Sequence, residues 1–347
     1  MFRRFLLPGV LLFLPIMGTA QKTVSIIGVG DIMMGTNYPE SSKGAYLPPD
    51  GGITLFAEVT PFLHSADIVF GNLEGVIMDK GGTPKSCNNP NVCYVFRTPE
   101  SYVTNLTNAG FNVMNMANNH VHDFGRDGAL NSLRVLTQNK IHTAGLEGVA
   151  EYTIFEQNGL TFGFCGFAPN TGTVSINNYA KVREIIPHLD SLCDIVIVSF
   201  HGGAEGATHS RVPKKREIFL GENRGDVYEF AHLCIDLGAD VVFGHGPHVP
   251  RAMELYKDRF IAYSLGNFCT PFRMNMSGTS GYAPMVKVIT DQTGQFLRGE
   301  LQSAVQRDRT GPKLDEQKAC IKEIKRLTEL DFPTGRLLIS NDGILGK

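Results

Sequence analysis

The feature that most constrains the fold is a series of short apolar runs that alternate with helix-length stretches. The runs are rich in β-branched and aromatic residues, and they cover Val24–Val29, Ile68–Phe70, Phe111–Met114, Leu160–Phe167, Asp194–Phe200, Asp240–Phe243 and Phe260–Tyr263. Helix-length stretches precede several of them, at Pro99–Ala109, Gly125–Asn139, Lys181–Leu192 and Asp226–Leu237. This alternation predicts an α/β fold with a mostly parallel central sheet.

Near the C-terminus the pattern changes. Two strand-like runs, Pro284–Thr290 and Gln295–Gln306, flank a short turn and predict an antiparallel hairpin. The 347 residues would permit two domains, but no linker, charge block or internal repeat marks a boundary. We therefore expect one domain over residues 21–347.

The first 20 residues have the pattern of a secretory signal peptide. Arg3 and Arg4 precede an apolar run that ends at Met17, and small residues follow at Gly18 and Ala20. The run is short for a membrane span, and no cysteine follows it as in a lipoprotein. We expect cleavage after Ala20 and an exported protein, periplasmic or extracellular. The alternative is an uncleaved anchor that would keep the protein associated with a membrane.

Export changes the interpretation of the seven cysteines. In an oxidising compartment Cys87 and Cys93, which lie in one turn-rich segment, can form a local disulfide. Cys165, Cys193 and Cys234 lie in apolar segments and are expected to be small core residues. The sequence has no CxxC pair of the kind that binds zinc.

Polar, metal-ligating residue types follow six of the predicted strands. Because the carboxyl ends of strands in α/β sheets meet in one crevice, these side chains should converge. They are Asp31, Asn72, Glu74, Asn119, His120, His201, Glu205, His245 and His248. One such residue alone would be read as a loop or helix cap, but six strand ends in succession favour a site for a divalent metal. The formal net charge of −2 gives no sign of a nucleic-acid partner.

These segments resemble the ordered motifs of the CapA-type poly-γ-glutamate capsule-biosynthesis family, which is similar to the calcineurin-like metallophosphoesterases. The motifs are Gly30–Gly35 (GDIMMG), Gly71–Gly75 (GNLEG), Ala117–Gly125 (ANNHVHDFG), His201–Glu205 (HGGAE), Gly244–His248 (GHGPH) and Tyr263–Phe268 (YSLGNF). The resemblance extends from about Val24 to Phe268. It implies a four-layer αββα sandwich of the metallophosphoesterase type with mixed sheets and a metal centre at one edge.

The resemblance also implies a ligand set, which transfers only residue by residue. The metal ligands would be Asp31, Glu74, Asn119, His201, His245 and His248. Met33 stands where the phosphoesterase motif has a histidine, and Asn72 stands where it has a bridging aspartate, so Glu74 is the candidate for that role. The final histidine pair is one residue wider than in the motif. The set therefore implies one or two divalent ions, with Mn, Zn, Ca and Fe all open.

His120 and Asp123 are the candidate catalytic residues. A divalent ion lowers the pKa of bound water and polarises a phosphoryl or carbonyl oxygen, and His120, held by Asp123, could act as general acid or base. The alternative role for Asp123 is to cap the helix predicted just after it.

A basic loop after His201 bears on the substrate. The segment Thr208–Arg216 carries five basic or imidazole residues, and it is either a solvated surface or a patch that attracts a polyanion. With the loops Ser41–Gly52 and Gly81–Asn91 it would rim the cleft. The candidate substrate-binding residues are Asn72, Glu205, Arg211, Lys214, Lys215, Arg216 and Asn267.

Three functions remain open. The first is a metal-dependent hydrolase that acts on an anionic envelope polymer, either poly-γ-glutamate or a phosphoester. The second is a non-catalytic accessory protein of polymer synthesis or export, with capsule-synthesis membrane proteins as partners. The third is a metal-assisted peptide epimerase that uses the same acid–base residues.

Overall fold

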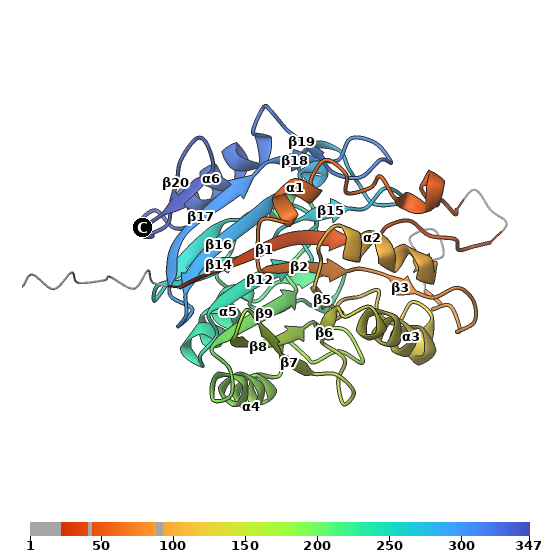
Figure 1. Ribbon diagram of the computed structural model, residues 1–347, viewed down its shortest axis with the longest axis horizontal. Coiled ribbons are helices and arrows are strands. Elements are labelled where there is room, and N and C mark those ends of the chain that lie inside the picture. Colours follow the sequence, from red (N-terminus) through yellow and green to blue (C-terminus); the bar gives the residue numbers. More distant parts are fainter. Residues whose placement is uncertain (1–21, 41–43, 88–92) are drawn as a thin grey trace, which may run out of the picture.

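The computed structural model describes residues 22–40, 44–87 and 93–347, and its centre is a pair of packed β-sheets (Figure 1). Within these residues the larger sheet has nine strands in the order β20-β21-β17-β16-β1-β2-β5-β6, with β15 also pairing with β1. Their bounds are β1 Thr23–Ile32, β2 Ile68–Leu73, β5 Val113–Asn115, β6 His142–Ala144, β15 Asn267–Cys269, β16 Met285–Asp291, β17 Phe296–Gln302, β20 Leu338–Ile339 and β21 Ile344–Gly346. Strands β15, β1, β2, β5 and β6 run parallel, and β16, β17, β21 and β20 add an antiparallel half.

The second sheet has six strands in the order β13-β14-β12-β9-β8-β7. Their bounds are β7 Tyr152–Gln157, β8 Leu160–Phe167, β9 Ile195–His201, β12 Val241–His245, β13 Met253–Tyr256 and β14 Arg259–Ala262. The four central strands are parallel, and the edge strands β7 and β13 are antiparallel to their neighbours. Both sheets are therefore mixed, as predicted.

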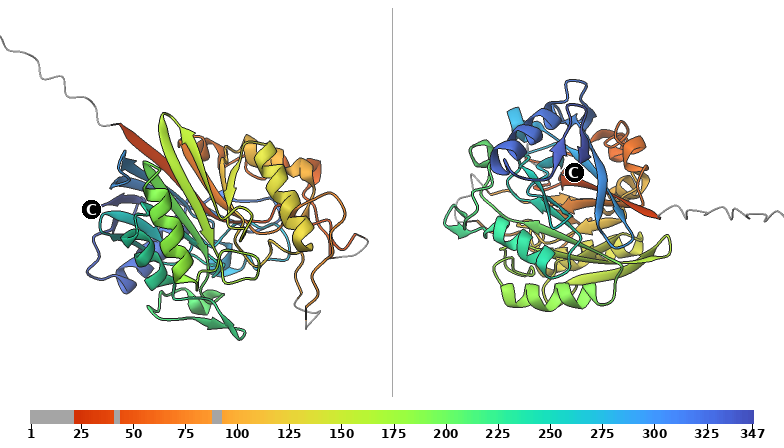
Figure 2. Two further views of the ribbon diagram at one scale, coloured as in Figure 1. Left: turned by 90° about the horizontal axis from the view of Figure 1, so that it is seen from below. Right: turned by 90° about the vertical axis from the view of Figure 1, so that its left-hand side faces the viewer.

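Helices cover the outer faces of both sheets (Figures 1 and 2). The larger sheet carries α1 (Thr60–Leu63), α2 (Val103–Asn108) and α3 (Gly125–Gln138), and the smaller carries α4 (Tyr179–Asp190) and α5 (Val227–Asp236). Helix α6 (Ala319–Asp331) contacts β13 and β17. The remaining elements are the strand pairs β3 (Val76–Ile77) with β4 (Arg97–Thr98), β10 (Ile218–Phe219) with β11 (Glu222–Asn223), β18 (Ala304–Val305) with β19 (Lys313–Leu314), and the 3₁₀ turns η1 (Pro49–Gly52), η3 (Glu100–Tyr102), η4 (Ala207–His209) and η5 (Gly278–Gly281).

Three buried apolar clusters separate the four layers. Alternation along β1 places Ile26 in the cluster between the sheets and Ile27 in the cluster under α1 to α3, because successive side chains of a strand point to opposite faces. The same alternation along β9 places Ile197 between the sheets and Val198 under α4 and α5. The predicted αββα sandwich is therefore confirmed.

Aromatic rings fill the space between the sheets. Phe70 of β2 stacks on Phe243 of β12 with ring centroids 5.2 Å apart, and Phe164 of β8 lies 5.6 Å from Phe70. Glycine is required at position 28, since a Cβ there would lie 2.5 Å from the Phe243 ring. Close packing at this interface fixes the strand ends of one sheet relative to those of the other.

Most predicted elements are present, and several were missed. The seven predicted strands correspond to β1, β2, β5, β8, β9, β12 and β14, and the predicted C-terminal hairpin corresponds to β16 and β17. The four predicted helices correspond to α2 to α5. The edge strand β7 and helix α6 were not predicted.

The cysteine predictions can be compared with the structure directly. Cys87 and Cys93 form a disulfide. Cys165 and Cys234 are buried, whereas Cys193 is only partly buried. The predicted signal peptide lies outside the described residues. Among the helices of the described segments, none has the length and apolar character needed to cross a bilayer.

Candidate metal centre

The site forms where parallel strands of both sheets end. In the larger sheet Asp31 at the end of β1 is in register with Asn72 of β2 and with Asn267 of β15. In the smaller sheet His201 of β9 is in register with His245 of β12. The loops that follow β2 and β12 then place Glu74 and His248 over the same edge.

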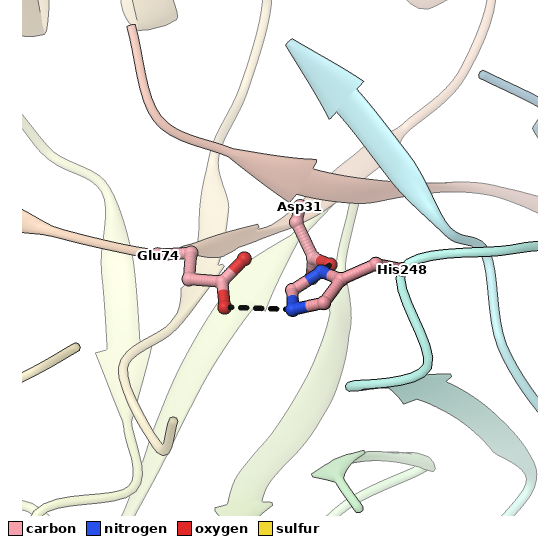
Figure 3. Close-up of side chains that lie close together, drawn as sticks. All are labelled: Asp31, Glu74 and His248. Atoms are coloured by element: carbon pink, nitrogen blue, oxygen red, sulfur yellow. Dashed lines mark hydrogen bonds and ion pairs between the residues drawn. The ribbon is translucent and has the colours of Figure 1, made fainter. Parts of the chain in front are cut away.

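Asp31, Glu74 and His248 come together from three elements (Figure 3). Each offers one ligand atom, and these atoms all lie within 4.8 Å of one another. His248 Nδ1 lies 3.0 Å from Asp31 Oδ2, and its Nε2 lies 3.7 Å from Glu74 Oε1. His201 approaches the same carboxylate, with Nε2 4.0 Å from Glu74 Oε1.

Several ligand-type atoms at this edge are buried without a hydrogen-bond partner. They are Oε1 and Oε2 of Glu74, Nε2 of His201 and Oδ1 of Asn119. Glu74 is 0% exposed, and neither carboxylate oxygen accepts a hydrogen bond, although His248 Nε2 lies within ion-pair distance of Oε1. Because buried polar groups are normally paired, so many free ligand atoms indicate a missing partner, and their chemistry fits a divalent cation.

The charged groups of the cluster shift one another's pKa values strongly in the absence of an ion. Burial, together with the charge of Asp31, raises the pKa of Glu74 well above its usual range. Burial would also raise the pKa of Asp31, but the hydrogen bond and charge of His248 keep it low. Burial opposes protonation of His248, yet Glu74 and Asp31 raise its pKa to about 10. Burial lowers the pKa of His201 well below its usual value, which leaves a neutral imidazole able to bind a metal.

Asn72 turns its amide nitrogen, not its oxygen, toward the cluster. The amides of Asn115 and Asn118 are oriented by backbone groups: each side-chain oxygen accepts from a backbone N–H, and each nitrogen donates to a carbonyl. Both nitrogens also donate to Asn72 Oδ1, at 2.9 and 3.1 Å. Asn72 Nδ2 therefore donates to Asp31 Oδ1 at 2.8 Å. In this arrangement Asn72 cannot replace a metal-bridging carboxylate, and it is too enclosed to bind substrate.

His245 and Met33 also differ from a complete two-metal set. His245 Nε2 lies 3.0 Å from the carbonyl of Val29, and its Nδ1 lies 3.5 Å from Ser199 Oγ, so both ring nitrogens have protein neighbours. Met33 is buried, and its sulfur accepts the N–H of Gly35. We therefore leave His245 out of the proposed ligand set, which consists of Asp31, Glu74, Asn119, His201 and His248 and is suited to one ion.

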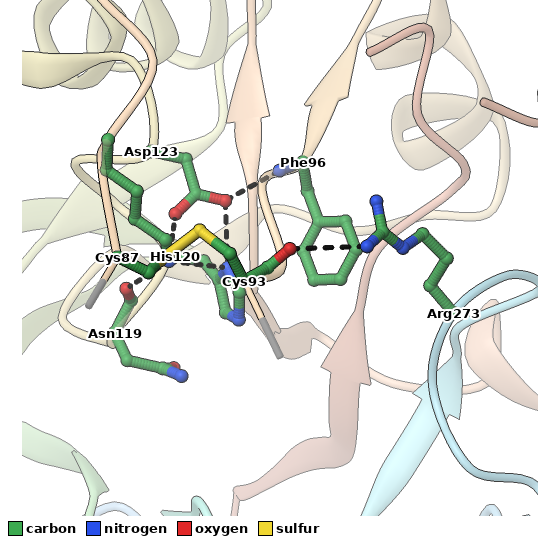
Figure 4. The surroundings of a disulfide bond; sticks show 8 residues. Cys87, Cys93, Phe96, Asn119, His120, Asp123 and Arg273 are labelled. Atoms are coloured by element: carbon green, nitrogen blue, oxygen red, sulfur yellow. Dashed lines mark hydrogen bonds and ion pairs between the residues drawn. A yellow bond between two sulfur atoms is a disulfide. The ribbon is translucent and has the colours of Figure 1, made fainter. Parts of the chain in front are cut away.

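His120 and Asp123 form a buried pair beside this centre (Figure 4). His120 Nδ1 lies 2.8 Å from Asp123 Oδ2, and Asp123 Oδ1 pairs with Lys85 Nζ at 2.5 Å. Asp123 also accepts the backbone N–H of Phe96 at 2.6 Å. The alternative role of Asp123 as a helix cap is wrong, because α3 has Phe124 at its N-cap position and no side-chain cap. Burial lowers the pKa of His120 despite the charge of Asp123.

A cavity of about 470 Å³ opens next to the centre. It is lined by Lys85, Cys87, Tyr94, Asn119, His120, Asn170, Glu205, Phe219, Leu220, Glu222 and Arg224. Lys85 and Cys87 of the expected rim segment Gly81–Asn91 line it, whereas no described residue of Ser41–Gly52 does.

The predicted basic patch lies elsewhere. Arg211 pairs with Asp331 at the end of α6, and Lys214 Nζ lies 4.7 Å from the centre of the Phe332 ring. Arg216 lines a different cavity, with Tyr179 and Glu229 among its walls, and Lys215 is exposed. Of the predicted substrate-binding residues only Glu205 lines the cavity, because the loop packs against α5 and α6 instead. Asn267 is buried beneath His248, with Oδ1 3.1 Å from its Nδ1.

Comparison with known proteins identifies the family. Residues 25–271 match the model of the bacterial capsule synthesis protein family PGA_cap. The chain belongs to that family. It is 28% identical over 274 residues to the capsule biosynthesis protein CapA of Bacillus anthracis, covering 73% of this chain and 61% of the relative. It is 27% identical over 264 residues to the PGA biosynthesis protein CapA of Bacillus subtilis, covering 72% and 64%. The match thus spans less than two thirds of either relative.

Similar solved structures include a putative 5'-nucleotidase of Staphylococcus aureus, at 16% identity and a TM-score of 0.46, covering 89% of this chain and 58% of that one. Purple acid phosphatase PPD1 of yellow lupin is 12% identical with a TM-score of 0.39, covering 85% and 53%.

Some residues of the site were not predicted from the sequence. Asn118 lies within the motif Ala117–Gly125 and Asn115 lies two residues before it, so their residue type and position were a usable signal. Lys85 lies in the loop expected to rim the cleft, and Arg224 follows the predicted basic loop, but neither was assigned a role. Asn170 lies in a segment without a recognisable motif.

The Glu74 carboxylate provides a test of the metal centre. Without metal, Glu74→Gln should be as stable as the wild type or more stable, because Gln resembles the neutral acid that burial favours. Added Mn²⁺ should stabilise the wild type by about 2.7 kcal/mol at about 100 times its dissociation constant, and the variant far less. Thermal melting with and without Mn²⁺ measures both effects. Glu222→Gln, which changes an exposed glutamate of the same cavity, should respond to Mn²⁺ as the wild type does. Equal responses of Glu74→Gln and wild type would contradict the ligand assignment.

Proposed function

We propose that the chain is a metal-dependent hydrolase that acts on an anionic polymer of the cell envelope. The observation that carries this proposal is the set of buried ligand atoms without hydrogen-bond partners, on Glu74, His201 and Asn119, beside the His120–Asp123 pair at a cavity. A protein that only binds a charged polymer would need an exposed charged surface. It would not need buried metal-ligand atoms beside a pair of proton-transfer residues.

Asp31, Glu74, His248, His201 and Asn119 would hold the ion. When bound, a divalent cation supplies Lewis-acid chemistry by polarising a substrate oxygen and lowering the pKa of water. Asn72 donates to Asp31 Oδ1 and so orients the carboxylate, whose Oδ2 faces His248 Nδ1. Burial keeps competing water away from these groups and strengthens their electrostatic interactions.

His120 would transfer the proton. Its Nδ1 is engaged by Asp123, which leaves Nε2 for the cavity. Because burial lowers its pKa, His120 is neutral at pH 7 and able to accept a proton before it donates one to a leaving group. Asp123 orients the ring, and Lys85 neutralises the second oxygen of that carboxylate.

The polymer is proposed from the family and from the relatives' names. Two relatives are named for capsule or PGA biosynthesis, and a Mycobacterium tuberculosis relative is named a probable polyglutamine synthesis accessory protein. Poly-γ-glutamate is therefore the first candidate substrate and a phosphoester-containing polymer the second.

A non-catalytic accessory role is the alternative, favoured by Asn72 and Met33, which leave the metal set incomplete relative to the phosphoesterase motif. The basic patch no longer supports polymer binding at the site, because Arg211 and Lys214 pack against α6 and its following residue.

His120→Asn separates catalysis from binding. Removal of the proton-transfer group should lower turnover by about 10²–10⁴ while metal content and substrate affinity stay near wild type. Turnover of γ-glutamyl oligomers, a phosphodiester and a peptide substrate, together with metal analysis, measures this. His188→Asn, an exposed histidine on α4, is the control and should retain full activity. Unchanged turnover in His120→Asn would overturn the catalytic assignment, and binding of an oligomer without turnover by the wild type would favour the accessory role.

We also propose that the protein is exported after cleavage between Ala20 and Gln21. The disulfide between Cys87 and Cys93 supports an oxidising compartment. Mass spectrometry of protein from the exported fraction should find Gln21 at the N-terminus and both cysteines oxidised. A retained Met1, or free thiols at both positions, would be inconsistent with export.

A further inference from the structure

Arg224 is a buried cation in the cavity wall that the proposed chemistry does not yet use. It is 2% exposed, and its backbone is fixed by hydrogen bonds with Gly203 and Glu217, both 2.9 Å. Its Nη1 lies 3.1 Å from Glu205 and 3.6 Å from Glu222. The protein therefore holds the guanidinium in one orientation from one side.

The other side of this guanidinium lacks partners. Nε and Nη2 are both buried and have no hydrogen bond in the structure. The Nε–H and one Nη2–H point to the same edge of a guanidinium, and this edge binds the two oxygens of a carboxylate in a bidentate manner. Buried charged donors without acceptors cost free energy of folding. The protein therefore maintains an edge of Arg224 that can bind an oxyanion, at a cost to its own stability.

Arg224 lies close to the metal centre. The charge of Arg224 affects both Glu74, whose pKa it lowers against the effect of burial, and His201, whose pKa it lowers in addition to burial. Arg224 shares the cavity with Asn119 and His120. An oxyanion on Arg224 would thus be a neighbour of both the ligand set and the proton-transfer pair.

The remaining walls indicate which oxyanion fits. Glu205 and Glu222 offset the charge of Arg224, and Asp123 offsets that of Lys85, so the lining has little surplus positive charge. A doubly charged phosphate monoester would be repelled by the two glutamates more strongly than a singly charged carboxylate. Phe219 and Leu220 of the β10–β11 hairpin form an apolar wall, and Leu220 at its tip is 88% exposed. Such a wall suits the methylene groups that carry a side-chain carboxylate.

We propose that Arg224 binds a carboxylate group of the substrate through Nε and Nη2 and thereby selects carboxylate-bearing chains over chains that carry phosphate monoesters. This proposal rests on the proposed function only in assuming that the substrate binds at this site. It concerns binding of the substrate and not its turnover. Arg224 is thus a specificity-determining residue that none of the sequence motifs contains.

Calorimetric titration of the full protein, in Mn²⁺ and separately in EDTA, tests the proposal with three probes. Glutarate supplies carboxylates on methylene groups, glutaramide is its uncharged analogue, and methyl phosphate is the phosphoryl probe. The wild type should bind glutarate and not glutaramide. Arg224→Lys keeps the charge but loses the planar edge and should weaken glutarate binding about 10- to 100-fold. Arg224→Met, of similar volume, serves as a second variant, and melting curves confirm that each variant is folded.

The control is Arg216→Lys, an exposed arginine outside this cavity, which should change the affinity for glutarate less than about twofold. Wild-type affinity for glutarate in both Arg224 variants, or no binding of glutarate by the wild type, would overturn the proposal. A loss confined to methyl phosphate would overturn the carboxylate assignment in favour of a phosphoryl one. If Arg224-dependent binding is found but no hydrolysis occurs, the proposed function fails and this inference stands.

Discussion

The buried carboxylate of Glu74 is the group on which the interpretation of this structure depends. Two oxygens without hydrogen-bond partners, at a position with no solvent exposure, cannot carry a charge stably unless a cation neutralises them. His248 supplies one positive charge, but Asp31 already engages it through Nδ1. The free nitrogen of His201 and the free oxygen of Asn119 are ligand types that the same proposed cation could bind.

The two-sheet architecture makes such a site possible. Asp31 and Asn72 come from the larger sheet, and His201 comes from the smaller, so the centre spans the line where the sheets meet. Stacked rings such as Phe70 and Phe243 fix the distance between the sheets. Gly28 leaves room for the Phe243 ring because it has no side chain. Asp31 and His201 lie at the ends of buried strands, and short loops after β2 and β12 bring Glu74 and His248 to them. Hydrogen bonds among the side chains of Asn72, Asn115 and Asn118 then set the direction of each amide group.

The sequence predicted the fold well because its strands are buried on both faces and read as continuous apolar runs. It did not predict β7, where exposed and buried residues alternate at a sheet edge, or α6, which lies beyond the recognised motifs. The motifs named Asp31, Glu74 and His248, which the structure brings together, but they also named His245, which turns to the Val29 carbonyl. Side-chain direction follows from tertiary contacts that the spacing of motifs does not contain. The basic loop shows the same limit, since cation–aromatic and ion-pair contacts with α5, α6 and Phe332 draw it away from the cavity.

The central claim is that the chain holds a divalent ion between Asp31, Glu74 and His248. Anomalous X-ray scattering from crystals grown with Mn²⁺ tests it most directly. The account predicts one strong peak at about 2.0–2.3 Å from a Glu74 oxygen and from a nitrogen of His248. A map without a peak there, with Glu74 hydrogen-bonded to ordered water instead, would contradict it.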